Sequence, residues 1–199
     1  MPTIDESEGR LALLASGFRL VFRWLDDRWT HALELDDGSS ETSLASSIEG
    51  AADPSRLVSP AFQQIHALRP ADDPEAVRAL LLGQVGPHHT SAAFTLRESN
   101  SGVLVSVEVA DRCRSEIVAL ASTYAVDLPP GNLRAADPSS IRWDLSPGSL
   151  SLCFEAAPPA RVGLREAGRR GVQVQAAALV SPGESTFTWS YSWMAERSR

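Results

Sequence analysis

Residues 17–35 place the strongest constraint on the fold, because their side chains alternate with a period of two. Such alternation is typical of β-strands. A hairpin with its turn at Asp26 and Asp27 pairs mostly apolar side chains with one another on one face and mostly polar side chains with one another on the other face. A shift of the register by one residue would break the pairing on both faces. The expected pairs are Trp24 with Trp29, Phe22 with His31, Leu20 with Leu33, Phe18 with Leu35, Arg19 with Glu34, and Arg23 with Thr30.

Further hairpins are indicated along the rest of the chain. Residues 141–154 surround the turn signal Pro147-Gly148. The expected pairs there are Ile141 with Phe154, Arg142 with Cys153, Trp143 with Leu152, Asp144 with Ser151, and Leu145 with Leu150. Weaker alternation predicts two more hairpins, at 94–109 and 162–178. The aromatic and β-branched run at 187–193 predicts the strongest single strand.

Some segments have no clear pattern. Residues 76–85 fit either a helix or a buried strand, and residues 114–124 have the spacing of a short helix through Ile117, Leu120 and Tyr124. We predict a mainly β fold, an antiparallel β-sandwich or barrel built from hairpins, with one or two short helices. The chain is expected to form a single β-rich domain over 1–199, with an N-terminal arm at 1–16, a loop-rich stretch at 38–60 and a crossover segment at 111–139.

Composition excludes several classes of function. The net charge of −7 comes from 25 acidic residues against 18 basic ones, so a nucleic-acid partner is not expected. All 18 basic residues are arginine, which removes Schiff-base, pyridoxal-phosphate and P-loop lysine chemistry. The acidic N-terminus does not resemble a signal peptide, and the apolar run at 11–15 is too short to cross a bilayer. We therefore expect a cytoplasmic protein with reduced cysteines and no membrane association.

Motifs that carry known chemistry are missing from the sequence. It contains no glycine-rich phosphate loop, no HExxH, no CxxC and no GxSxG. The weak catalytic candidates are His88 and His89, which follow Gly86-Pro87, with His66 as a third histidine. Adjacent side chains on a strand point to opposite faces, and no cysteine or carboxylate lies at ligand spacing, so we expect no metal site and no cofactor.

Aromatic residues supply the weak candidates for ligand binding, which are Trp24, Trp29 and His31. Exposed tryptophan rings could stack on a ligand, but the alternation instead predicts that they pack in the core. His31 is expected on the apolar face of the first hairpin, as a core histidine with one hydrogen-bond partner.

The sequence leaves three functions open. The first is a non-enzymatic module for protein interaction or assembly, with an unknown protein partner or self-association. The second is a hydrolase or isomerase with a histidine–carboxylate site in a barrel mouth. The third is a carrier of a small ligand in a tryptophan-lined cavity. A pocket in which a histidine and a carboxylate converge would favour the second function.

Overall fold

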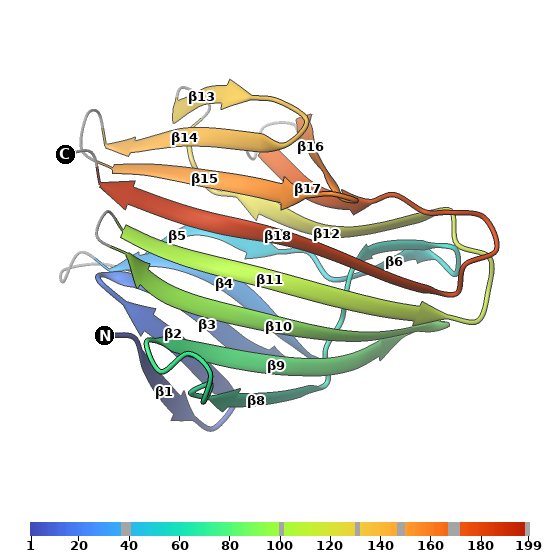
Figure 1. Cartoon of the computed structure of the whole chain (residues 1–199), viewed down its shortest axis with the longest axis horizontal. Helices are drawn as coiled ribbons and strands as arrows, with labels where there is room; N and C mark the ends of the chain where they lie inside the picture. Colours follow the sequence, from blue (N-terminus) through green and yellow to red (C-terminus); the bar gives the residue numbers. More distant parts are fainter. Residues whose placement is uncertain (37–40, 100–101, 130–131, 147–149, 167–171, 198–199) are drawn as a thin grey trace.

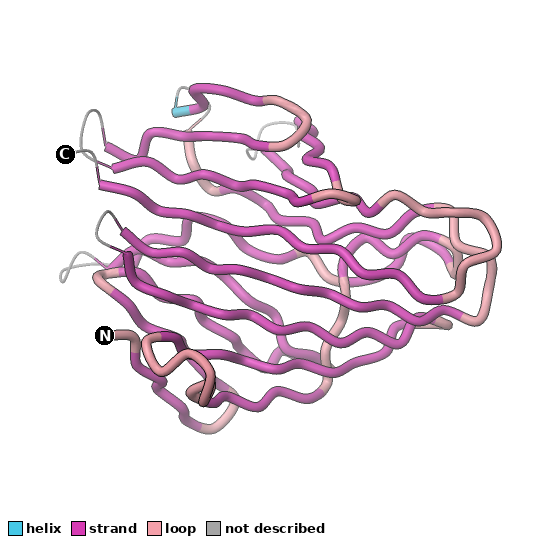
Figure 2. The backbone as a smooth tube through the Cα atoms, in the orientation of Figure 1, coloured by secondary structure: helices cyan, strands magenta, loops and turns pink. Residues whose placement is uncertain are grey.

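The computed structural model is a sandwich of two β-sheets and describes residues 1–36, 41–99, 102–129, 132–146, 150–166 and 172–197. Strands make up 74% of the structure, and Figure 2 shows how they run through both sheets. The sheets are open, so the fold is a sandwich and not a closed barrel. The named elements of the described residues are all strands, and helix makes up about 1% of the structure. No helix of the described chain is long and apolar enough to span a membrane.

The first sheet has ten strands. Its order is β1 (Thr3–Ser7), β2 (Arg10–Ala15), β3 (Phe18–Leu25), β4 (Arg28–Asp36), β5 (Glu41–Ser47), β12 (Ala119–Val126), β17 (Val172–Ala178) and β16 (Arg161–Glu166), with β6 (Gly50–Asp53) and β7 (Arg56–Ser59) beside β12. The pairs are antiparallel except β7 with β12, which run parallel.

The second sheet has eight antiparallel strands, of which the last in sequence lies near the middle. Its order is β13 (Leu133–Ala136), β14 (Ser140–Ser146), β15 (Leu150–Ala157), β18 (Thr186–Arg197), β11 (Gly102–Cys113), β10 (His88–Ser99), β9 (Ala76–Val85) and β8 (Gln64–Leu68). Figure 1 shows this sheet lying across the first, with β18 between β11 and β15.

The core lies between the two sheets. The buried apolar residues form one cluster with members from both. Aromatic rings meet edge to face across the interface, as Phe22 does with Phe94 at 5.3 Å and Tyr124 with Trp193 at 5.3 Å. These contacts hold the sheets face to face at the spacing of close-packed side chains.

The first hairpin confirms the predicted register at all six pairs, Trp24 with Trp29 included. Asp26 adopts a positive φ of 56° in its turn. In the second hairpin four of the five pairs are confirmed. The fifth is wrong, because a register shift pairs Leu150 with Ser146 rather than Leu145. The turn at 147–149 lies outside the described residues. The hairpins β10–β11 and β16–β17 and the strand β18 are also confirmed.

Other expectations need correction. Residues 1–16 form β1 and β2 of the first sheet instead of an arm. The stretch 38–60 contributes β5, β6 and β7, and its residues Leu44, Ala45 and Leu57 are buried in the core. The segment 111–139 does pass from one sheet to the other and back, but it also contains the whole of β12.

Two ambiguous segments turn out to be strands. Residues 76–85 form β9, and the helix expected at 114–124 is wrong because β12 begins at Ala119. Five consecutive residues of β12, Leu120 to Tyr124, are buried. A strand covered on both faces loses the alternation that marks a half-buried strand, which explains the helix-like spacing.

Candidate functional site

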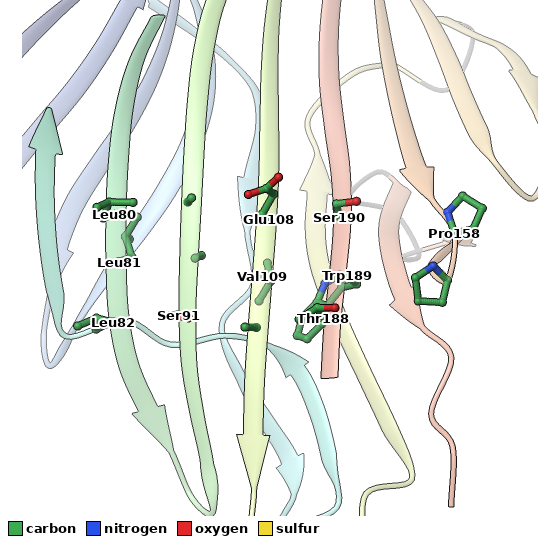
Figure 3. Close-up of a pocket in the computed structure, with 14 residues that line it drawn as sticks. Leu80, Leu81, Leu82, Ser91, Glu108, Val109, Pro158, Thr188, Trp189 and Ser190 are labelled. Carbon is green, nitrogen blue, oxygen red and sulfur yellow. The ribbon is translucent and has the colours of Figure 1, made fainter. Parts of the chain in front are cut away.

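A groove of about 630 Å³ lies on the face of the eight-stranded sheet that is turned away from the core (Figure 3). We call it the outer groove. Strands β9, β10, β11 and β18 and the turn after β15 form it. Its lining residues are Leu80, Leu81, Leu82, Ser91, Ala92, Ala93, Glu108, Val109, Ala110, Pro158, Pro159, Thr188, Trp189 and Ser190.

The groove exists because short side chains lie between taller ones. The central strands turn alanine and serine outward at Ser91, Ala93, Ala110 and Ser190, and these form the floor. On one side β9 raises Leu80 and Leu82, which are 40% and 53% exposed. On the other side lies Pro158, directly after β15 (Figure 3), and Pro159 follows it in the lining.

Glu108 carries the only charge among the described residues that line the outer groove. It lies on β11, paired with Ala93 on one side and Ser190 on the other. It is exposed and makes no hydrogen bond or ion pair with any other described residue. Its carboxylate is therefore available to a ligand that lies over the small side chains.

A second, smaller depression of about 340 Å³ adjoins the groove along the same strands. We call it the acidic depression. It shares Glu108 and Ser190 with the outer groove and adds the outward side chains Ser106, Ser192 and Glu155. The register places Glu155 beside Ser192 and Ser192 beside Ser106, one outward row from Glu108. The two depressions together form a surface that is apolar at one end and acidic at the other.

The predicted catalytic histidines are not brought together. His88 is fully buried on the inner face of β10, whereas its neighbour His89 is exposed on the outer face. His66 is exposed on β8, where it pairs with Leu80, while His89 pairs with Gln84 four residues farther along β9. Among the described residues, no three His, Cys, Asp or Glu side chains come together in a group that could hold a metal ion.

His88 does meet a carboxylate that the sequence argument missed. Its Nδ1 lies 3.0 Å from Oδ2 of Asp111, and both side chains are buried. Burial raises the pKa of Asp111, an effect opposed by the hydrogen bond from His88. The Nε2 atom of His88 and the Oδ1 atom of Asp111 have no hydrogen-bond partner. Neither residue lines the outer groove or the acidic depression, so this pair is enclosed in the core.

The predicted ligand-binding residues do not form one site. Trp24 is 42% exposed and meets the half-buried Trp29 edge to face at 5.7 Å, so its predicted place in the core is wrong. His31 is buried, and its Nε2 lies 2.8 Å from the hydroxyl of Tyr124, as expected of a core histidine with one partner. The three residues line neither the outer groove nor the acidic depression.

His31 belongs to a buried polar chain that joins the two sheets. The Tyr124 hydroxyl lies 2.7 Å from that of Tyr191, which comes from the opposite sheet. Burial lowers the pKa of His31 to about 3. Burial also raises the pKa of Glu49, whose Oε1 is 3.9 Å from Nδ1 of His31. A neutral histidine in this position links the sheets through hydrogen bonds.

Sequence reasoning missed the outer groove, although β9 contains a signal for it. Residues 76–82 are apolar at almost every position, so both faces of the strand carry apolar side chains. Val77, Ala79 and Leu81 pack in the core, whereas Leu80 and Leu82 lie on the outer face and are exposed to solvent. An apolar outer face on a strand is a sign that something covers it. Compared with known proteins, the sequence matches no protein-family model and no curated protein.

Proposed function

We propose that this chain is a non-enzymatic binding module and that the outer groove receives an extended apolar segment of a protein partner. The observation that carries the proposal is the pair of exposed leucines, Leu80 and Leu82, at the wall of a groove with a floor of small side chains. Clustered apolar surface of this kind marks interaction sites. Covering it removes apolar area from water, which contributes about 25 cal/mol for each Å² buried.

Charge favours a foreign partner over a second copy of the chain. Each copy carries a net charge of −7, so two copies repel one another at long range. A two-fold contact between outer grooves would also bring two Glu108 carboxylates into one desolvated surface, where like charges oppose binding. We place this activity in the cytoplasm, and the free, buried Cys113 and Cys153 support a reducing compartment.

The test is selection from a random 12-residue peptide library displayed on phage, with the wild-type chain as bait. The double variant Leu80→Ser/Leu82→Ser removes the leucine wall. Leu25→Ser/Leu164→Ser is a matched control, because these leucines are 58% and 39% exposed and line no part of the groove. Thermal unfolding of each variant checks that it is folded.

We expect wild type and control to select the same peptides and to bind them equally. The groove variant should lose at least about tenfold in affinity, as two buried leucine contacts require. Failure to select any peptide, or peptides that bind the groove variant as well as wild type, would overturn the proposal. It would also be overturned if wild type sediments as a dimer and the groove variant as a monomer, because the occupant would then be a second copy.

A further inference from the structure

We infer that the partner segment carries a basic side chain, two residues from an apolar one, and that Glu108 and Glu155 bind it. The inference rests on the proposed function, since it names the chemistry of the segment that occupies the outer groove. It is based on the fact that the apolar outer groove and the acidic depression form one continuous surface. The outer groove and the acidic depression share Glu108 and Ser190, so one ligand can contact both.

The direction of the ligand follows from the sheet register. Outward side chains of β11 occur in rows at Ala110, Glu108 and Ser106, with the apolar groove over the first two and the acidic depression over the last two. Outward positions on a strand are about 7 Å apart. An extended peptide lying parallel to β11 has the same repeat, since its side chains on one face are also two residues apart. A residue seated over Ala110 and Ser91 therefore places the residue two positions away over Glu108 and Ala93, where a long basic side chain can extend into the acidic depression.

Glu108 and Glu155 form no ion pair with any described residue. Two arginines lie on the same outer face, but Arg78 donates a hydrogen bond to Oγ1 of Thr95 and Arg142 lies 3.9 Å from the carboxylate of Glu196. Glu108 has no partner, and Glu155 contacts only its neighbour Cys153, whose Sγ lies 3.5 Å from Oε1. The other outward side chains of the depression are the hydroxyls of Ser106, Ser190 and Ser192, which carry no charge. A guanidinium or ammonium group would be held by two carboxylates and several hydroxyl acceptors.

The surroundings strengthen such a pairing. A peptide over Leu80, Leu82 and the two prolines excludes water from one side of Glu108. Electrostatic attraction grows as water is excluded, so a pair closed under a bound segment contributes more than one on an open surface. The leucines thus provide affinity, while Glu108 and Glu155 select which apolar segments bind.

The experiment uses the best groove-dependent peptide from the phage library and a synthetic version with its basic residue replaced by glutamine. Fluorescence anisotropy gives the affinity of both peptides for wild type, Glu108→Gln, Glu155→Gln and the control Glu75→Gln, an exposed carboxylate that lines neither depression. We expect the glutamine peptide to bind wild type and control at least about fivefold more weakly. That difference should shrink to less than about twofold in Glu108→Gln and in Glu155→Gln. Added salt should lower the affinity of the basic peptide for wild type and leave the affinity of the glutamine peptide nearly unchanged.

Two results would overturn the inference alone. One is selection of peptides that need Leu80 and Leu82 but show no enrichment of Arg or Lys at two residues from an apolar position. The other is an unchanged penalty for the glutamine peptide in both glutamate variants. Peptides that bind independently of Leu80 and Leu82, or no selected peptides at all, would overturn the proposed function and this inference with it.

Discussion

At the scale of single residues, burial sets the chemistry of His31. The imidazole has exchanged water for the rings of Phe22, Phe94 and Tyr124, with one hydrogen bond to the Tyr124 hydroxyl. A charged imidazolium in that position would lose hydration that these neighbours do not replace. The folded state therefore holds His31 neutral, whereas the unfolded chain protonates it below its ordinary pKa of 6.5.

A pH dependence follows with a definite sign. Because the folded pKa of His31 is lowered to about 3, its contribution to stability is complete above pH 6.5 and is lost as the pH falls towards 3. Between pH 7 and pH 5 this one group should lower the free energy of unfolding by about 2 kcal/mol. Urea unfolding of wild type and of His31→Gln at both pH values checks it. The raised pKa of Glu49 acts in the opposite direction, and because Glu49 contacts His31 the comparison is repeated in a Glu49→Gln background to isolate His31.

Equal losses in wild type and His31→Gln would contradict this assignment. Such a result would mean that other groups carry the pH dependence and that His31 titrates with nearly its ordinary pKa in the folded chain.

The tryptophans should differ in their cost of removal. Trp189 is 2% exposed, and its Nε1 donates a hydrogen bond of 3.0 Å to Oγ of Ser122 in the opposite sheet. We expect Trp189→Ala to lower the free energy of unfolding by about 3–5 kcal/mol, as large aromatic truncations in cores do. Trp24→Ala should cost less than half as much, because that ring is 42% exposed. Denaturant midpoints of both variants measure the difference, and equal costs would mean that Trp189 is not a core residue.

At the scale of elements, one glycine lets the chain pass from the first sheet to the second. Residues 60–63 make that passage between β7 and β8 and cross close to β9 at Gly83. A Cβ atom on Gly83 would lie 2.0 Å from the backbone oxygen of Ala61 and 2.6 Å from Cα of Phe62. Both are backbone atoms, so relief requires the linking segment to move.

Gly83→Ala should therefore destabilise the protein by about 1–3 kcal/mol or more. Gly163→Ala is the control, since the nearest atoms to its added Cβ belong to the Gln175 side chain at 3.9 Å. Urea midpoints decide between them. Equal midpoints for the two variants would show that residues 60–63 can move away from the added Cβ atom at little cost in stability.

The elements also explain what the sequence allowed us to predict. The β3–β4 hairpin was predictable residue by residue because its partners are a few positions apart and one face is apolar. The position of β12 was not predictable, because its neighbours β5 and β17 lie about 70 and 50 residues away in the sequence. A local pattern of side chains does not identify pairing partners at such separations. The outer groove was hidden for the same reason, since Leu80, Glu108 and Ser190 become neighbours only when β9, β10, β11 and β18 align.

At the scale of the whole molecule, the two sheets share one apolar core. Residues of both contribute to a single cluster, and the polar chain from His31 to Tyr191 crosses the same interface. We expect one cooperative unfolding transition, because neither sheet can expose its inner face alone. Far-UV circular dichroism and tryptophan fluorescence should give superimposable urea curves. Two separate transitions would show that the sheets unfold independently.

The central place of β18 has a consequence for the order in which the chain is made. The ribosome delivers Thr186–Arg197 after the other named strands of the described chain, yet this strand joins β11 to β15 in the middle of its sheet. Until it emerges, β8–β11 and β13–β15 are separate pieces, each with an unpaired inner edge and an uncovered row of apolar side chains. Unpaired edges are templates for pairing with other chains. The nascent protein is thus exposed to misassembly throughout synthesis, and a chain that stops before Thr186 keeps both edges open permanently.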